Sequence, residues 1–106
     1  MGQRQQVQAL AAYPYATVLD STQYNIDGEV KYASAFCSDD DYSATPQTKW
    51  SASNRGACLI IRVSATVKTP DENKAAEPYS SSGTSYSNFA VIDAGGNNFK
   101  VTRVVN

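Results

Sequence analysis

Three consecutive carboxylates, Asp39, Asp40 and Asp41, form the densest run of side chains in this sequence that could do chemistry. Carboxylate oxygens are the ligands that Ca²⁺ prefers, and because the ion takes about six to eight oxygens, the run could supply two or three of them. It lacks the glycine and the terminal glutamate of an EF-hand loop, and loop charges of this kind are usually solvated. We therefore predict solvated charge and no metal site, with a calcium site as the alternative.

Catalysis by the commonest acid–base residue is excluded because the chain contains no histidine. This rules out Ser-His-Asp and Cys-His pairs and every histidine-ligated metal site, and no glycine-rich phosphate-binding motif is present. Two carboxylates could hydrolyse a glycosidic bond, but Glu29 lies two positions from Lys31, and Glu72 and Glu77 flank Lys74. We predict that the protein is not an enzyme and has no cofactor, with a small hydrolase using Asp or Glu as the alternative.

Cys37 and Cys58 are the only cysteines and lie 21 positions apart. This spacing is neither a redox Cys-x-x-Cys motif nor a four-ligand zinc site. We predict a disulfide, which would contribute roughly 3 kcal/mol by restricting the unfolded chain; two reduced, buried thiols are the alternative. A disulfide in turn predicts an extracellular or cell-surface location, because such bonds persist in oxidising compartments.

The seven tyrosines favour contact surfaces over catalysis, because a tyrosine ring offers flat apolar area with a polar tip and loses little entropy on binding. Tyr42 and Tyr79 fall in predicted loops and, with the three aspartates, are our candidate contacts to a ligand or partner. Trp50, the single tryptophan, is expected to fill the core.

Charge and hydropathy exclude two classes of partner. Nine basic and ten acidic residues leave a net charge of −1, which gives no broad positive field for nucleic acid. No apolar run approaches the roughly 20 residues that a transmembrane helix needs. The polar start, residues 1–6, does not resemble a secretory signal, so we expect any signal or anchor segment of an extracellular protein to lie outside this sequence.

Alternating apolar and polar residues predict β-strands along most of the chain. Strands are expected at residues 15–19, 23–26, 29–37, 49–51, 57–68, 85–93 and 98–105. Tight turns are expected at Asp27-Gly28 and at residues 94–97, because glycine and asparagine tolerate left-handed backbone angles. Polar, proline-containing segments predict exposed loops at residues 38–47 and 69–84.

About seven short strands separated by turns are typical of an all-β, antiparallel β-sandwich with a C-terminal hairpin. Residues 1–12 are expected to form an arm or a short helix, and residues 13–106 a single domain. The predicted core residues share one face of their strands: Val30, Phe36, Leu59, Ile61, Val63, Val67, Phe89, Val91, Phe99 and Val101.

These features together predict a non-catalytic extracellular interaction or structural domain of a surface, adhesive or filament-type protein. Loops on a rigid β scaffold are where binding residues concentrate, so the two long loops are expected to contact a protein or glycan surface. Alternatively, an open strand edge pairs with another copy and builds an oligomer or filament. A carbohydrate-binding module is the second alternative, since glycans are bound by exposed aromatic, amide and acidic side chains.

Overall fold

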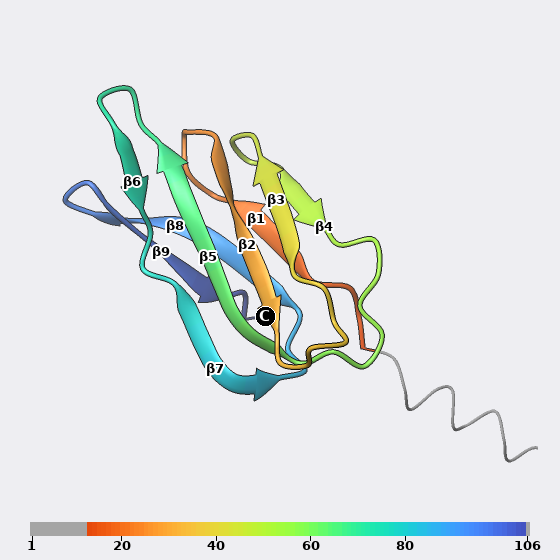
Figure 1. Cartoon of the computed structure of the whole chain (residues 1–106). Coiled ribbons are helices and arrows are strands. Elements are labelled where there is room, and N and C mark those ends of the chain that lie inside the picture. The colour runs from red at the N-terminus through yellow and green to blue at the C-terminus, as the bar shows by residue number, and fades with distance from the viewer. Residues whose placement is uncertain (1–12, 106) are drawn as a thin grey trace, which may run out of the picture.

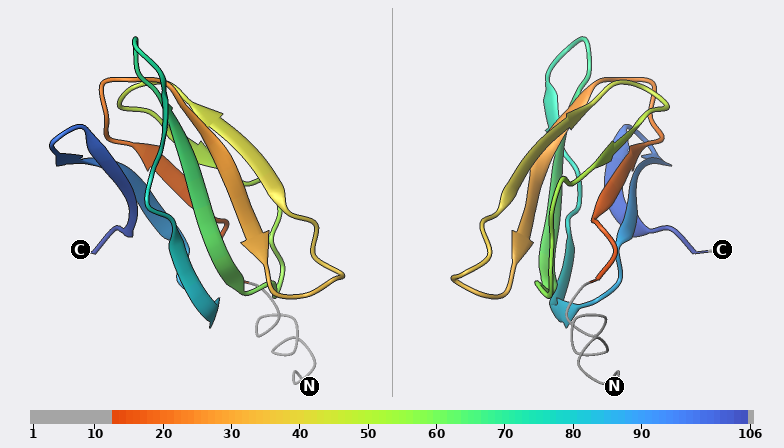
Figure 2. Two further views of the ribbon diagram at one scale, coloured as in Figure 1. Left: turned by 60° about the vertical axis from the view of Figure 1, so that its left-hand side comes forward. Right: turned by 90° about the vertical axis from the view of Figure 1, so that its right-hand side faces the viewer.

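Two β-sheets packed face to face make up the part of the chain that the structure describes, residues 13–105 of a computed structural model (Figure 1). The nine strands in this part are β1 (Thr17–Asp20), β2 (Ile26–Tyr32), β3 (Asp40–Ala44), β4 (Lys49–Ser51), β5 (Ile60–Lys68), β6 (Asn73–Ala75), β7 (Tyr79–Thr84), β8 (Asn88–Gly95) and β9 (Asn98–Arg103). One sheet has the order β4-β1-β8-β9, and the other has the order β3-β2-β5-β6, with β7 also paired to β5. The predicted all-β sandwich is confirmed, and Figure 2 shows its two layers edge on.

The pairing of β1 is the one departure from an antiparallel arrangement among the described strands. On one side β1 pairs antiparallel with β4, and on the other it pairs parallel with β8, with Thr17 opposite Asn88 and Asp20 opposite Val91. The Thr17 hydroxyl donates a hydrogen bond to Asn88 Oδ1 at 2.8 Å. One neighbour of β1 in its sheet, β8, therefore lies about 70 residues later in the chain.

The predictions that residues 38–47 and 69–84 are loops are wrong. The first segment contains β3, which pairs with β2, and the second contains β6 and β7, which both pair with β5. All three strands lie at sheet edges. Polar composition misleads here because an edge strand is held by its backbone ladder and buries only one face, so strand propensity is a weak guide.

The predicted turn at Asp27-Gly28 is also wrong, because both residues lie inside β2. A β-carbon at Gly28 would collide with the backbone carbonyl oxygen of Ser64 and lie 2.8 Å from the Tyr42 hydroxyl. Gly28 therefore allows the Ser64 backbone and the Tyr42 hydroxyl to lie close to β2. Such a close approach is a common reason for a glycine inside a strand.

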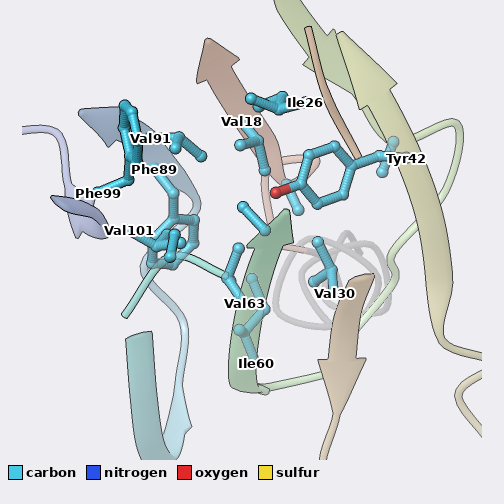
Figure 3. Close-up of a cluster of buried hydrophobic side chains, with 14 of the residues drawn as sticks. Val18, Ile26, Val30, Tyr42, Ile60, Val63, Phe89, Val91, Phe99 and Val101 are labelled. Carbon is cyan, nitrogen blue, oxygen red and sulfur yellow. The ribbon is translucent and has the colours of Figure 1, made fainter. Parts of the chain in front are cut away.

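The core lies between the two sheets and contains most of the predicted residues (Figure 3). Predicted and buried to at least 95 % are Val30, Val63, Val67, Phe89, Val91, Phe99 and Val101. Strand alternation accounts for this success, because residues two apart on a strand face the same side of the sheet.

Three predicted core positions are wrong. Ile60 is fully buried, whereas Leu59 and Ile61 are only half-buried. The pairing of β5 shifts register between Ile60 and Arg62, and one extra residue in a strand exchanges the two faces beyond it. Phe36 is 99 % exposed, since β2 ends at Tyr32 and the chain then turns away from the core.

The predicted disulfide between Cys37 and Cys58 is confirmed, with the two Cα atoms 6.1 Å apart. It joins the turn after β2 to the segment before β5, and these two strands are neighbours in one sheet. The bond therefore closes one end of a sheet instead of linking the two sheets.

The predicted C-terminal hairpin is confirmed as β8 and β9. Gly95, Gly96 and Asn97 in its turn have φ angles of 90°, 64° and 64°, the left-handed region that glycine and asparagine tolerate best.

Residues 1–12, predicted as an arm or short helix, lie outside the described residues. In residues 13–105 there is no helix with the length and apolar content needed to cross a bilayer.

Because of the bulge in β5, two adjacent isoleucines differ in burial, and their contributions to stability should differ accordingly. Replacing Ile60 with Ala should cost about 2–5 kcal/mol of unfolding free energy, because it removes a fully buried side chain and leaves a cavity. Replacing Ile61 with Ala should cost clearly less. Urea unfolding of both variants measures the difference, and a larger loss for Ile61 would show that the face assignment is reversed.

Candidate partner-binding groove

The three consecutive aspartates lie where the chain enters β3, and each has a different setting. Asp39 accepts hydrogen bonds from Lys31 Nζ at 3.4 Å and from the backbone N–H of Tyr32 at 3.3 Å. Asp40 accepts one from the Tyr32 hydroxyl at 2.7 Å, and Asp41 is exposed. Successive side chains of a strand point to opposite faces, so these carboxylates diverge. No group of three or more metal-ligating side chains is found in residues 13–105.

The placement of Tyr42 in an exposed loop is wrong. The residue lies in β3 and is 4 % exposed. Its ring packs against Trp50 at a centroid distance of 5.3 Å, and its hydroxyl donates a 2.7 Å hydrogen bond to the Ser64 carbonyl oxygen. The Tyr42 side chain thus passes over Gly28 of β2 to reach β5. Tyr42 is a core residue and not the surface contact that we predicted. Trp50 is partly buried against the same core.

Tyr79, the other predicted contact, lies at the start of β7 and is half-buried. Its ring packs against Phe89 in a tilted arrangement, at a centroid distance of 4.9 Å. It also lines a surface groove between the two sheets; of the other predicted contact residues, Asp40 and Asp39 line separate, smaller or shallower hollows beside the disulfide.

This groove runs between β7 of one sheet and β9 of the other and has a volume of about 460 Å³. Figure 1 shows the two strands on the same side of the sandwich. The groove is lined by Glu77, Pro78, Tyr79, Ser80, Lys100, Val101, Thr102, Arg103 and Val105. It therefore combines backbone of a sheet edge with one tyrosine ring, two cations and one carboxylate.

The floor of the groove is an open strand edge because the chain leaves β9 at Pro78. Before that point, Glu77 donates its N–H to the Phe99 carbonyl oxygen at 2.9 Å and accepts the Val101 N–H at 2.8 Å. Proline has no N–H to continue such a ladder, and the next residue, Tyr79, pairs with Val63 in the other sheet.

The groups left open on β9 follow from strand geometry. The N–H and C=O of one residue point to the same side of an antiparallel strand, and the side alternates along the chain. Since the Val101 N–H points away from β8, the Val101 C=O and the Arg103 N–H point away too. No backbone partner for either group lies within residues 13–105.

Aromatic packing holds the cation at the far end of the groove. The Arg103 guanidinium lies 4.1 Å from the centre of the Tyr86 ring, a cation–π contact. Tyr86 in turn meets Phe89 edge to face, at 5.8 Å between centroids. Beyond Arg103, Val105 exposes 80 % of its surface. The groove thus ends in a positioned positive charge and an apolar side chain.

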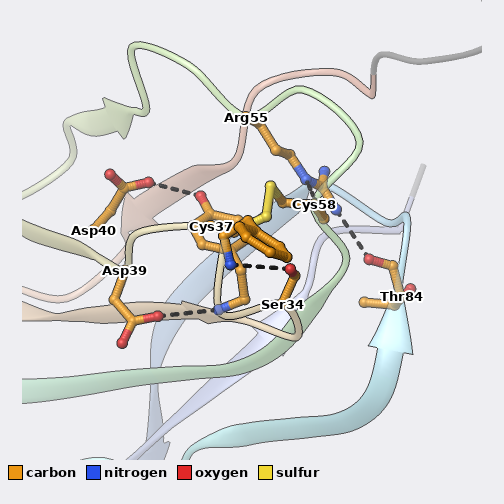
Figure 4. The surroundings of a disulfide bond; sticks show 9 residues. Ser34, Cys37, Asp39, Asp40, Arg55, Cys58 and Thr84 are labelled. Carbon is orange, nitrogen blue, oxygen red and sulfur yellow. Dashed lines mark hydrogen bonds between the residues drawn. A yellow bond between two sulfur atoms is a disulfide. The ribbon is translucent and has the colours of Figure 1, made fainter.

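Arg55, which lies between two predicted strands, is the principal residue that sequence reasoning missed. It is 4 % exposed and lies beside the disulfide (Figure 4). Its guanidinium donates to the carbonyl oxygens of Cys58, Pro14 and Thr84 at 2.8, 3.0 and 2.9 Å, and to the Ser87 hydroxyl at 2.6 Å. No ion-pair partner of this guanidinium is found in residues 13–105, and burial lowers the pKa of Arg55.

Asp20, which directly follows the strand predicted at residues 15–19, is a fully buried carboxylate at the end of β1. Its Oδ1 accepts hydrogen bonds from the Thr22 N–H at 2.9 Å and the Thr22 hydroxyl at 2.7 Å, and its Oδ2 has no partner in the described residues. No sequence signal distinguishes this aspartate from an ordinary turn residue.

The comparisons with known proteins identify no relative: no family model, no curated protein and no solved structure matches the chain.

Alkaline titration tests the burial of two tyrosines. Burial, the largest cause in each case, raises the pKa of Tyr42 and of Tyr32 well above the usual value of 10. In the unfolded chain both phenols ionise near pH 10, so the unfolded state releases protons first and the stability they contribute, complete below about pH 10, is lost as the pH rises further. Absorbance near 295 nm should show two of the seven tyrosines ionising only as circular dichroism reports unfolding. Titration of all seven with unchanged circular dichroism would contradict this.

The conservative variant Arg55→Lys should cost about 2–4 kcal/mol of unfolding free energy. A lysine has no planar fork of donors, so the carbonyls of Pro14 and Thr84 would be left buried and unpaired. The matched control is Arg62→Lys on the exposed face of β5, which should change stability by less than about 0.5 kcal/mol. Equal effects of the two substitutions in urea unfolding would refute a central role for Arg55.

Proposed function

We propose that this chain is a non-catalytic interaction or structural domain of an extracellular or cell-surface protein, and that it binds an extended segment of a partner along the open edge of β9. The observation that carries the proposal is a pair of backbone groups on the groove floor that have no partner within residues 13–105, the Val101 C=O and the Arg103 N–H. An added strand satisfies such groups with main-chain hydrogen bonds, while neighbouring pockets select its side chains.

The groove walls supply the selectivity that backbone pairing lacks. The half-buried ring of Tyr79 and the exposed side chain of Val105 offer apolar contact. Lys100 and Arg103 lie on opposite faces of β9, so an added strand would meet a cation on each face. An extended segment with apolar and acidic side chains fits these walls best.

The distribution of charge supports a role without catalysis. Four carboxylates lie in ion pairs on the outer surface: Asp27 with Lys68, Glu72 with Lys74, and Glu29 and Asp39 with one shared lysine, Lys31. A glycosidase needs two carboxylates facing each other across a substrate, and these pairs do not provide that. The disulfide supports the extracellular location.

The carbohydrate-binding alternative is weakened by the two tyrosines on which it rested. Tyr42 is buried in the core, and the half-buried ring of Tyr79 packs against Phe89. Protein contact through a strand edge is therefore the function that the geometry supports best.

Two substitutions at one position test the backbone role. Arg103→Pro removes the outward N–H and fills the groove edge with the proline ring, which a sheet tolerates at an edge position whose N–H faces outward. Arg103→Ala removes the same charge and ring contact but keeps the N–H. Linear peptides selected from a random displayed library on the unaltered protein should bind Arg103→Pro about tenfold more weakly than Arg103→Ala, the size of one lost hydrogen bond with its access blocked.

The same experiment has outcomes that overturn the proposal. Equal peptide binding by the two variants, or no enrichment of any peptide on the unaltered protein, would show that the β9 edge does not bind an extended partner segment. A glycan array in which one glycan binds both variants equally well would favour the carbohydrate-binding alternative instead.

A further inference from the structure

A second open edge lies on the opposite side of the sandwich. β3 ends its sheet on the side where it contacts β4, whereas β9 ends the other sheet on the side where it contacts β6 and β7. Figure 1 shows β3 and β9 on opposite flanks of the molecule. Within residues 13–105 no further strand pairs with the outer side of β3.

The two edges carry opposite charge. Lys100 and Arg103 are exposed on opposite faces of β9, and among residues 13–105 Glu77 is the one carboxylate lining that groove. Asp40 and Asp41 lie on opposite faces of β3 and follow Asp39 directly. If β3 of one copy paired with the open stretch of β9 of another, its carboxylates would lie beside Arg103 on one face and near Lys100, which adjoins that stretch, on the other.

The lengths of the two edges also agree. β3 has five residues, and the stretch of β9 and its continuation that follows the contact with Glu77 runs from Val101 to Val105. An edge strand of five residues therefore fits beside the open stretch without meeting the segment at Glu77 that covers the start of β9.

We propose that the partner of the β9 edge is β3 of a second copy of this chain. The inference rests on the proposed function, because it names the occupant of the same groove. The contact joins two different surfaces, so it is heterologous: a row of copies keeps a free β3 at one end and a free β9 at the other, and the row can grow. Opposite charge on the two edges favours this pairing over β9 with β9 or β3 with β3.

Exchange of charge between the edges tests the inference on the full chain. One variant carries Lys100→Glu and Arg103→Glu, and the other carries Asp39→Lys and Asp41→Lys. In sedimentation velocity, the unaltered chain should associate as its concentration rises, and more weakly at high salt. Each variant alone should associate at least about tenfold more weakly, because like charges then face each other.

An equimolar mixture of the two variants should regain association, since every contact between unlike copies again joins opposite charges. That recovery also shows that both variants are folded. The matched control reverses two exposed cations on the central strand β5, Arg62→Glu and Lys68→Glu, and should leave association unchanged.

A chain that stays monomeric at all concentrations, or association that the edge variants leave unchanged, overturns the inference, as does a mixture that gives no recovery. If these results come together with a clear difference in peptide binding between Arg103→Pro and Arg103→Ala, the groove binds a different protein and only its assignment to a second copy is wrong. If the peptide difference is absent as well, the proposed function fails with it.

Discussion

The guanidinium of Arg55 donates hydrogen bonds to three stretches of chain that are distant in sequence. They are the approach to β1 at Pro14, the segment before β5 at Cys58, and the end of β7 with its connection to β8 at Thr84 and Ser87. These stretches belong to both sheets. Burying a cation is costly, and within residues 13–105 Arg55 has hydrogen-bond acceptors but no ion-pair partner, so its burial is favourable only while every acceptor stays in place. The end of the sandwich near the disulfide is thereby fixed as a unit.

The position of the groove depends on that unit. The connection from β7 to β8 passes from one sheet to the other, and Arg55 holds it by the carbonyl of Thr84 and the hydroxyl of Ser87. At its other end β7 is separated from the edge of β9 by Pro78. With both ends of β7 fixed, the strand cannot swing back onto β9 and close the open edge. An unpaired strand edge promotes aggregation unless it is protected or bound by a partner. An edge that is held open in this way is therefore a candidate binding surface.

Much of the fold could be predicted from the sequence, and the failures have physical causes. The faces of Val63 and Val67 follow from alternation, and the disulfide follows from having only two cysteines. The bulge at Ile61 could not be found, because Leu59, Ile60 and Ile61 are all apolar and give no alternation to read. The polar edge strands were missed since their pairing depends on backbone groups that all residues share.

Most of the candidate site was beyond sequence reasoning for a related reason. Tyr79 could be singled out as an aromatic residue in a polar segment, although its strand was not expected. Arg103 and Val101 were visible only as part of a hairpin, and which strand of a hairpin lies at the edge is decided by distant pairings. Arg55 gave no signal, because a buried arginine paired with carbonyls has the same sequence neighbourhood as one in an exposed turn.

The parallel pairing of β1 with β8 has a consequence for how the chain acquires its structure during synthesis. β1 emerges from the ribosome first, but its parallel neighbour is among the last segments to be made. Contacts between residues far apart in sequence slow folding, because the intervening chain must be ordered before they form. The other sheet, in which β2 pairs with β3 and β5, needs only earlier segments and can assemble first. Until the last hairpin arrives, the part of that sheet's apolar face that β8 and β9 cover stays exposed, and exposed apolar surface makes a partly folded chain prone to aggregate.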